Sequence, residues 1–522
     1  MKKVFPWFRK GGLFLSLLVP AAAGAAAQGG DVLLPIVGRI QPWSYSSPAL
    51  DNPTGKTLPV LEKVFRKAGA SFLQLEFREV VLGRGSFLEV SSLQDGASER
   101  LDARILETYG PYSSFFNGDA VKVRLFAGPH TKGNRFGVKT LGWGLPGGTA
   151  TPVPATLCGP DNRVLSRDRR VARALLRMSN YYSVGTAWLI NKKNCFVTAG
   201  HVLGAKSLTT LNVQFNVPLS SSSGGMRFPS PKDQYTWAGF TQRAFQVGGP
   251  GMDWGVFLTL KNVYTGKYPG EVQGDYFRIG GYPGAGAKLR VTGYGTDSTP
   301  RSYNLVQQTG TGPLAGISGS AIRYRVDTMG GNSGSPVIMA ATGMAVGIHT
   351  HGGCTWSGGY NTGTFFTYGP FAAAVKKFTG TSRAGAYKVF GQGCKGPAGV
   401  PLLVPGGVPV LGRTFRVDLF YLAPKTPAFL LTGSSMARWG RAKLPLDLSF
   451  YGAKGCSLLV GPELLSARTI GPFGGAYVRF VIPKLPVLVG ARFYQQWLVG
   501  DPKANPLGLI VSPGGAALVG KP

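Results

Sequence analysis

Short apolar runs alternate along the chain with turns rich in glycine and proline, and this pattern limits the available folds. The 522 residues include 78 Gly and 38 Pro without a Gly-X-Y period, which excludes collagen and favours β-rich domains. In the middle region no long amphipathic helix is evident before Phe371–Phe378, and the runs that precede it have strand length. With 43% hydrophobic and 15% charged residues, the chain can build several cores. We therefore expect an all-β protein of roughly two to four domains.

The first 27 residues have the pattern of a secretory signal peptide. A basic start, Met1–Lys10, precedes the apolar run Gly11–Ala27, which closes on an Ala25-x-Ala27 cleavage signal. Pro20 interrupts this run, whereas a membrane-spanning helix needs about 20 apolar residues without such a break. We expect export with cleavage near Ala27, an extracellular or periplasmic mature protein that does not span a membrane, and conditions that permit disulfides.

The net charge points to anionic partners. Fifty-six Lys and Arg against 23 Asp and Glu give +33, so an anionic polymer or a cell surface is a candidate partner. Export separates the protein from chromosomal DNA and the chain has no nucleic-acid recognition motif, so no specific nucleic acid is expected. We expect a monomer.

Three short motifs in the middle region carry residues suited to acyl transfer. FVTAGHVL contains His201, MDWGVFLTL contains Asp253 and GGNSGSPVI contains Ser333. A serine hydroxyl needs a base to take its proton, and an imidazole can accept that proton and return it to a leaving amine. A carboxylate fixes the imidazole tautomer and stabilises the imidazolium. Each motif alone is weak, but their order and separations predict one catalytic site.

The glycines around Ser333 predict an oxyanion site. Gly331 and Gly334 permit a sharp backbone turn, so that the amides of Gly331 and Ser333 can converge on a developing negative charge. Loss of one such donor typically lowers the rate by about 10²–10³-fold.

The segments TAGHV, DWGVF and GNSGSPV resemble the chymotrypsin-fold serine proteases. The Gly-Asn-Ser-Gly-Ser-Pro form is similar to the bacterial V8-like glutamyl endopeptidase branch. The resemblance covers the middle region and implies two β-barrels with the triad in the cleft between them. It further implies protein or peptide substrates, endopeptidase activity, and no metal or organic cofactor.

Flanking modules complete the expected organisation. The stretch Phe72–Trp143, with SFLEVSS and YSSFFNGDAVKVRLF, resembles the CUB-like jelly-roll modules of secreted proteases; a propeptide is the alternative. The last module, with GARFYQQWLVGDP, resembles accessory β-domains of secreted bacterial enzymes. The expected segments are a signal peptide at 1–27, an N-terminal β-sandwich at 28–150, a linker at 151–170, a trypsin-like protease domain at 171–382, a second linker at 383–407 and a C-terminal β-sandwich at 408–522.

The specificity pocket has two competing interpretations. In the V8-like branch, positions matching Thr328 and His349 contact a substrate glutamate, whose carboxylate needs donors when it leaves water. Asp327 stands six residues before Ser333, where trypsin-like enzymes place the acid that binds Arg or Lys. A third interpretation makes Asp327 a buried carboxylate satisfied by backbone amides. Glu271 is the only glutamate between Val171 and Thr379, so a glutamate-specific enzyme would spare its own catalytic region. We favour glutamate.

Five cysteines leave the pairing partly open. Cys394 and Cys456 can close a bridge in the last module, while Cys158, Cys195 and Cys354 form an odd set. The H-x-H-x2-C run that ends at Cys354 offers three metal ligands where a structural zinc site needs four, so no metal is expected.

A basic segment precedes the first motif. We expect Arg163–Arg177 to be compatible with a helix, and Arg163–Asn180 is either an exposed activation segment or a solvated linker. Asn332 stands where trypsins have the aspartate that pairs with a new α-amine, so that ion pair should be absent after cleavage.

Overall fold

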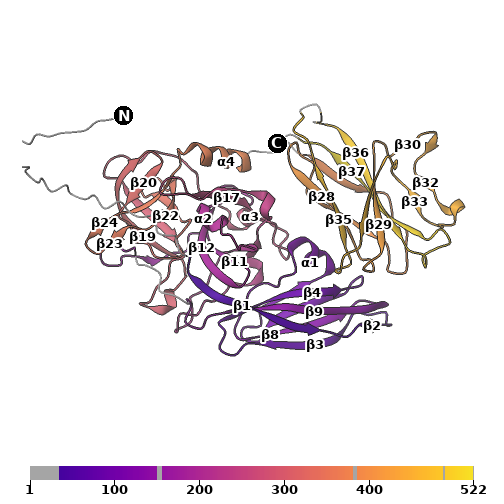
Figure 1. Ribbon diagram of the computed structural model, residues 1–522, viewed down its shortest axis with the longest axis horizontal. Helices are drawn as coiled ribbons and strands as arrows, with labels where there is room; N and C mark the ends of the chain where they lie inside the picture. Colours follow the sequence, from indigo (N-terminus) through magenta and orange to yellow (C-terminus); the bar gives the residue numbers. More distant parts are fainter. Residues whose placement is uncertain (1–33, 150–155, 380–384, 486–487, 489, 521–522) are drawn as a thin grey trace, which may run out of the picture. The chain divides into compact units, whose positions relative to one another are not determined.

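The computed structural model describes residues 34–149, 156–379, 385–485, 488 and 490–520 (Figure 1). The expected signal peptide lies outside these residues. Nearly all regular structure in the described residues is β (Figure 1). None of the described helices is long and apolar enough to cross a membrane.

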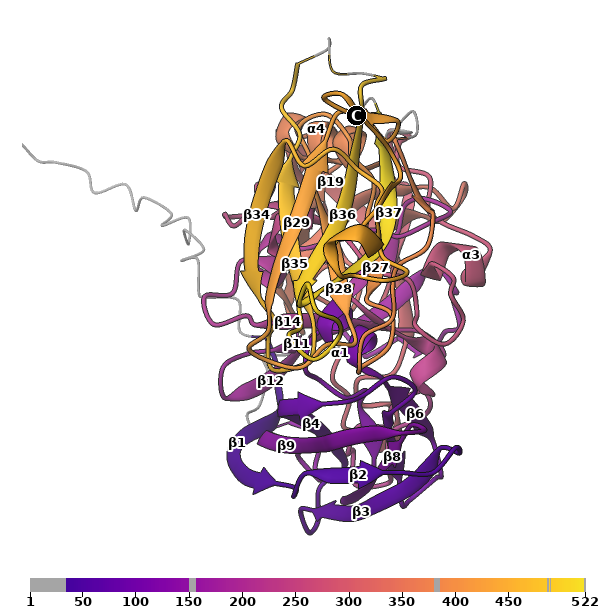
Figure 2. The same cartoon turned by 90° about the vertical axis from the view of Figure 1, so that its right-hand side faces the viewer.

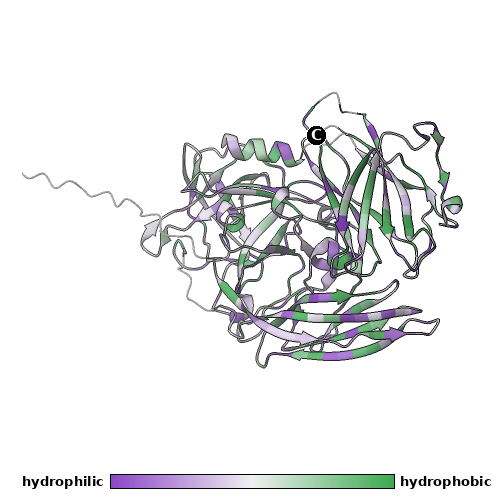
Figure 3. Cartoon of the chain, turned by 45° about the vertical axis from the view of Figure 1, so that its right-hand side comes forward, coloured by the Kyte–Doolittle hydropathy of each residue, from purple (hydrophilic) through white to green (hydrophobic). Residues whose placement is uncertain are grey.

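Two antiparallel sheets form the N-terminal module. One sheet has the order β3-β8-β5-β6, and the other contains β1-β9-β4-β7. Their apolar faces share one core, which includes Phe65, Leu88, Leu125 and Val138. Figure 3 shows hydrophobic and hydrophilic residues alternating along these strands, as expected where one sheet face is buried. The elements are β1 (Ile36–Ser46), β2 (Leu50–Asn52), β3 (Leu58–Arg66), β4 (Phe72–Val81), β5 (Phe87–Ser92), β6 (Ser98–Leu101), α1 (Ala103–Tyr109), β7 (Phe116–Asn117), β8 (Ala120–Ala127) and β9 (Thr131–Gly144).

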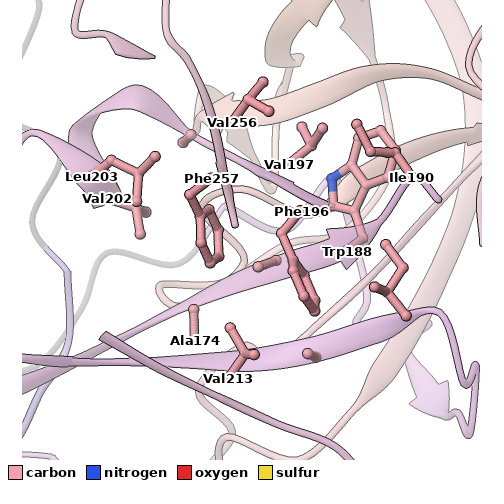
Figure 4. Packing of buried hydrophobic residues seen from close by; sticks show 14 of the residues in the cluster. Ala174, Trp188, Ile190, Phe196, Val197, Val202, Leu203, Val213, Val256 and Phe257 are labelled. Atoms are coloured by element: carbon pink, nitrogen blue, oxygen red, sulfur yellow. The ribbon is translucent and has the colours of Figure 1, made fainter. Parts of the chain in front are cut away.

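A first barrel follows, built from seven strands in the order β15-β14-β11-β12-β13-β17-β16. A bridge between Trp237 and Thr259 joins the ends of β15 and β17 and closes it. Inside, Trp188, Phe196 and Phe257 pack against valine and leucine side chains (Figure 4). The strands are β11 (Val171–Arg177), β12 (Tyr181–Leu189), β13 (Cys195–Thr198), β14 (Thr210–Gln214), β15 (Gln234–Thr236), β16 (Arg243–Gln246) and β17 (Trp254–Leu258).

A second barrel closes on itself, because β19 pairs with both β18 and β20 at the ends of the order β19-β18-β21-β22-β25-β20. The short β10 adds to β19. The pair of barrels is the chymotrypsin-like architecture, and the expected all-β fold with a double barrel is confirmed. The strands are β10 (Val164–Leu165), β18 (Lys288–Gly293), β19 (Gln308–Ser318), β20 (Ala321–Tyr324), β21 (Pro336–Met339), β22 (Ala345–His351) and β25 (Asn361–Phe365). Between β22 and β25, β23 (Cys354–Thr355) and β24 (Gly358–Gly359) form a separate two-stranded sheet. The helices of the barrel region are α2 (Gly200–Leu203), η1 (Pro231–Asp233), η2 (Phe240–Gln242), α3 (Pro269–Gln273), η3 (Arg301–Tyr303) and α4 (Gly369–Thr379).

The C-terminal module is a second two-sheet structure. Its five-stranded sheet has the order β26-β37-β36-β29-β34, and β27-β28-β35 form the facing sheet. Figure 2 shows β34, β29, β36 and β37 side by side. The two sheets share a core that includes Val417, Trp497 and Ile510. The elements are β26 (Ala386–Phe390), β27 (Leu402–Gly406), β28 (Thr414–Phe420), β29 (Pro427–Gly433), β30 (Arg438–Trp439), β31 (Ala442–Lys443), β32 (Leu446–Asp447), η4 (Ser449–Tyr451), β33 (Ser457–Leu458), β34 (Leu464–Thr469), β35 (Ala476–Val481), β36 (Arg492–Gly500) and β37 (Leu509–Leu518).

The expectation that Arg163–Arg177 is compatible with a helix is wrong. Its second half is β11, in which every residue is buried. Strand β11 lies between β12 and β14, so pairing on both sides overrides the local helical preference of its Ala and Leu residues. The buried Arg173 donates to Gln214 and to the carbonyl of Leu305. A solvated linker therefore cannot extend past Val171.

Strand β1 joins the N-terminal module to the first barrel. Its residues 36–39 pair with β12 and its residues 38–46 pair with β9, so one sheet runs from the module into the barrel. A buried ion pair crosses the same boundary, where Arg177 Nη2 lies 2.7 Å from Glu76 Oε2. Arg177 also donates to Gln74 and Tyr182. Hydrogen bonds, a buried ion pair and a common hydrophobic cluster thus connect the N-terminal module to the first barrel.

Glu99 is a buried carboxyl group at this boundary. Its oxygens accept hydrogen bonds from the amide and hydroxyl of Ser114 and from the hydroxyl of Tyr264, which follows the first barrel. Burial raises the pKa of Glu99 to about 7, against the lowering effect of these hydrogen bonds.

We expect Glu99→Gln to change the pH dependence of stability. Because the pKa of Glu99 in the folded protein lies above its unfolded value, this group stabilises the fold fully below about pH 4.5 and loses that effect as the pH rises through about 7. At about 1.4 kcal/mol per pKa unit, the loss is at most roughly 3 kcal/mol. Urea unfolding at pH 5 and pH 8 should show a smaller pH difference for Glu99→Gln than for the wild type. Glu62→Gln, at an exposed glutamate, should behave like the wild type, and an unchanged pH difference in Glu99→Gln would contradict the assignment.

Candidate active site

His201 and Asp253 are brought together by two neighbouring strands. His201 lies in α2 just after β13, and Asp253 precedes β17, which pairs with β13 through Thr198 and Gly255. His201 Nδ1 lies 2.5 Å from Asp253 Oδ2, and the His201 amide donates to Asp253 Oδ1 at 2.9 Å. Gly200 permits this approach, since a β-carbon there would lie 2.6 Å from Asp253 Oδ1. The buried carboxylate contacts both the main chain and the ring of His201, and these two contacts hold the ring in one orientation.

Ser333 lies on a tight turn against the same segment. Gly331 and Gly334 have φ values of 102° and 92°, which favour glycine. The Ser333 carbonyl accepts a hydrogen bond from the Thr186 amide at 2.8 Å. A β-carbon at Gly334 would lie 2.2 Å from Thr198 Oγ1, so the turn packs closely on the end of β13 that leads to His201.

The expected triad lacks one hydrogen bond in the described structure, the bond between His201 and Ser333. No hydrogen bond joins His201 Nε2 to the Ser333 hydroxyl, and His201 Nε2 is buried without a partner among the described residues. Catalytic hydrogen bonds are often long in the absence of substrate. The imidazole therefore has one nitrogen held by a carboxylate and one nitrogen available.

The amides of the turn divide into two groups. Asn332 donates to the Met329 carbonyl at 3.0 Å and Gly334 donates to the His349 carbonyl at 2.8 Å. The amides of Gly331 and Ser333 donate to no group in the described part of the chain. These are the two donors expected for an oxyanion. The Asn332 side chain bonds neutral groups, the Met329 carbonyl and the Ser335 hydroxyl.

His349 lies beside the serine turn. Its amide donates to the Ser335 carbonyl at 2.8 Å, and its carbonyl accepts from Gly334. Its Nδ1 lies 2.7 Å from the hydroxyl of Tyr324 in β20. Burial, followed by the charges of His351 and His201, lowers the pKa of His349 to about 3, while burial raises the pKa of Tyr324. Both groups are neutral near pH 7, and a Tyr324 hydroxyl that donates to Nδ1 leaves Nε2 as a hydrogen-bond donor.

Thr328 and Asp327 are buried beneath the segment that precedes β10. The Thr328 hydroxyl lies 2.7 Å from Thr156 Oγ1 and accepts from the Asn361 amide group. The Asp327 oxygens accept from the amides of Cys158 at 2.6 Å and Asn162 at 2.9 Å. Both Asp327 oxygens are therefore engaged by the main chain.

Two disulfides are present. Cys394–Cys456 lies in the C-terminal module, as expected, and Cys158–Cys354 ties residues before β10 to the β23–β24 hairpin. Cys195 is free and buried. Because Cys354 is in a disulfide, the H-x-H-x2-C run cannot supply a thiolate ligand.

Sequence reasoning missed the side chains that support this site. Tyr324, Thr156 and Asn361 each bond a residue of the expected pocket. None lies in a recognisable motif. Tyr324 is buried in a strand, where an aromatic residue is usually read as core packing.

The known proteins similar to this chain share low sequence identity with it and match only part of it. No family model matches the chain. The secreted RxLR effector protein 73 of Plasmopara viticola is 22% identical over 332 residues, which cover 58% of this chain and 80% of that protein. Among solved structures, a Glu endopeptidase in complex with MPD is 19% identical with a TM-score of 0.33, covering 43% of this chain and 100% of that one. The protease Anisep from Arthrobacter nicotinovorans is 12% identical with a TM-score of 0.34, covering 42% and 100%.

Proposed function

We propose that the protein is a secreted serine endopeptidase that cleaves peptide bonds after glutamate. The observation that carries the proposal is the His201–Asp253 contact of 2.5 Å, with His201 Nε2 buried and without a hydrogen-bond partner in the described segments. Ser333, with Gly331 and Gly334 near it, lies on a turn packed against the segment that precedes this histidine. The backbone amides of Gly331 and Ser333 on that turn donate to no other described residue. These are the groups that acyl transfer requires.

In the proposed reaction, Ser333 Oγ attacks the scissile carbonyl carbon and its proton moves to His201 Nε2. Asp253 stabilises the resulting imidazolium, and the amides of Gly331 and Ser333 donate to the carbonyl oxygen as it becomes negative. His201 then gives the proton to the leaving amine, which departs and leaves an acyl-enzyme. A water molecule, deprotonated by His201, attacks the ester carbonyl. The same proton returns to Ser333 as the acid product leaves.

The pocket chemistry supports glutamate over arginine or lysine. A neutral His349 whose Nε2 carries hydrogen can donate to a substrate carboxylate without a buried positive charge of its own. Asp327 is 2% exposed, and its two oxygens already accept main-chain hydrogen bonds from Cys158 and Asn162. The carboxylate is therefore stabilised by backbone amides and does not need a substrate cation. The Thr328 hydroxyl, which lies 2.7 Å from Thr156 Oγ1, can donate to the substrate when Thr156 is the donor of that bond.

Matched peptides that differ only in Glu, Gln or Lys before the cleaved bond test the pocket. We expect the wild type to have the highest kcat/KM with Glu. Loss of a hydrogen bond to a charged group costs about 1.5–3 kcal/mol, so His349→Leu should lower the Glu-over-Gln ratio roughly 10–150-fold. Tyr324→Phe, which leaves the ring but frees Nδ1, should lower it roughly 3–10-fold.

The rate of Ser333 labelling by an organofluorophosphate serves as the control in both variants, because it reports the triad and not the pocket. Thermal unfolding confirms that each variant is folded. A wild type that prefers Lys, or a His349→Leu variant with an unchanged Glu-over-Gln ratio, would refute the glutamate pocket and leave the protease assignment standing.

Secretion and the segment boundaries belong to the same proposal. Two disulfides favour an oxidising compartment, and the similar Plasmopara viticola protein is named a secreted effector. We propose signal-peptide removal near Ala27 and a catalytic domain spanning 171–382, preceded by a β-module at 28–150. The expected linker at 383–407 instead contains β26 and β27, which pair within the two sheets of the C-terminal module, so the expected start of that module at 408 is too late. Residues 156–165 are attached to the second barrel by the Cys158–Cys354 disulfide and by the pairing of β10 with β19. If the chain is cut between Cys158 and β10, the disulfide would keep the N-terminal piece attached to the barrel.

A further inference from the structure

Two small hairpins project from the C-terminal module. In the first, β30 pairs with β31; in the second, β32 pairs with β33 and η4 lies in the loop between them. Leu444 and Leu458 pack together with Leu431 of β29, so both hairpins are anchored to the same part of the module. Figure 1 shows β30, β32 and β33 together beyond β29.

These hairpins expose large apolar side chains. Phe450 is 92% exposed and Tyr451 is 57% exposed, with their rings 5.6 Å apart. Trp439 and Met436 of the first hairpin are also exposed. Of 23 exposed large apolar side chains in the described residues, four fall within residues 436–451, and two more, Leu464 and Leu465, lie in β34. Such a concentration usually marks an interaction surface.

The same hairpins carry unpaired positive charge. Arg438, Arg441, Lys443 and Lys454 are exposed, and none forms an ion pair with another residue that the structure describes. Arg438 and Lys443 are directly opposite each other across β30 and β31, where like charges repel. Asp447 is the one acid between residues 434 and 458. An anionic partner would relieve this repulsion.

We propose that these hairpins bind the surface of an anionic lipid bilayer. We call the set Met436, Arg438, Trp439, Arg441, Lys443, Phe450, Tyr451 and Lys454 the basic aromatic tip. Exposed aromatic and apolar side chains can enter the interface between headgroups and acyl chains, while lysine and arginine contact anionic headgroups. Phe450 and Met436 offer no hydrogen bonds that a polysaccharide could use, so the composition favours lipid. The inference is independent of the catalytic proposal.

Vesicle sedimentation tests the tip in the full mature chain, carrying Ser333→Ala to prevent self-cleavage. The chain should sediment with phosphatidylcholine vesicles that contain phosphatidylserine, weakly with phosphatidylcholine alone, and less as salt increases. At about 1 kcal/mol per basic residue near the membrane, Arg441→Gln with Lys443→Gln should lower the partition coefficient roughly 30-fold. Phe450→Ser should lower it with little change in salt dependence.

The matched controls are in β26, the edge strand of the five-stranded sheet farthest from β34, and in the loop that follows it. Lys388→Gln with Lys395→Gln removes the same charge, and Val389→Ser removes an exposed apolar side chain of β26, the edge strand opposite β34. These variants should bind as the parent does. As a second measurement, brominated acyl chains should quench tryptophan fluorescence in the parent and less in Trp439→Phe.

Three outcomes would overturn the proposal. Equal losses in the tip and control double variants would show a general charge effect. Quenching unchanged by Trp439→Phe would show that the tip does not enter the interface. Salt-sensitive retention on heparin without vesicle binding would assign the tip to a polysaccharide.

Discussion

Replacing Ser333 with Ala should lower kcat on a glutamyl peptide on the order of 10⁵–10⁶-fold while the protein remains folded. The reason is chemical, because the variant retains the His201–Asp253 contact but has no hydroxyl to form the acyl-enzyme. His201→Ala should cause a loss of similar size. The kcat of the double variant should be only slightly lower than that of either single variant, since the effects of residues that act as a unit are not additive. Steady-state kinetics with thermal unfolding checks this.

Ser335→Ala is the matched control for that loss. Ser335 is two residues further on and is also buried, and its hydroxyl donates one long hydrogen bond of 3.3 Å to Asn332 Oδ1. We expect its kcat to change less than about 10-fold, because it removes no donor from the proposed oxyanion site. A Ser333→Ala variant with kcat near that of Ser335→Ala would refute Ser333 as the nucleophile.

Glu76→Gln should destabilise the fold by about 3–5 kcal/mol, because it leaves the Arg177 charge buried without its carboxylate. The pair lies 2.7 Å apart, with 4% and 10% of the Arg177 and Glu76 side chains exposed. Arg177→Met with Glu76→Gln should recover part of the loss, since no buried unpaired charge remains. Lys139, the other partner of Glu76, is 62% exposed and stays solvated. Urea unfolding of the four proteins gives the coupling energy.

The exposed ion pair of Arg66 and Asp119 provides the control. Its atoms are 2.9 Å apart, but its side chains are 58% and 37% exposed, so Asp119→Asn should cost less than about 1 kcal/mol. Arg177 lies in the first barrel and Glu76 in the N-terminal module, so the expected result also means that the module stabilises the barrel. Equal, small effects of Glu76→Gln and Asp119→Asn would show that the module is dispensable for stability, as expected of a removable propeptide.

Local patterns in the sequence predicted the all-β fold and singled out the three groups that we propose to react. The glycine-flanked Ser333 and the two strand-end motifs identified groups that the fold brings close together, since strands β13 and β17 are neighbours. Period-two runs such as that in β8 also appeared where expected, because alternation directly reflects one buried face. Cys394 and Cys456, which the sequence offered as one possible pair, do form a disulfide.

Contacts between distant segments were beyond such reasoning. Asp327 could be assigned to a pocket or to main-chain amides, and the choice depends on Cys158, which lies 169 residues earlier. Strand β11 has a sequence compatible with a helix, and its neighbours β12 and β14 decide its conformation. The Tyr324–His349 contact links two strands that are not sequence neighbours. In each case tertiary pairing, which a local pattern does not encode, determines the outcome.

The most direct measurement is to locate the residue that an organofluorophosphate modifies. Mass spectrometry of the labelled, digested protein should place a single phosphoryl group on Ser333. The His201→Ala variant should label far more slowly, because the buried imidazole nitrogen that accepts the proton is gone. A phosphoryl group on another serine, or equal labelling rates with and without His201, would contradict the proposed triad.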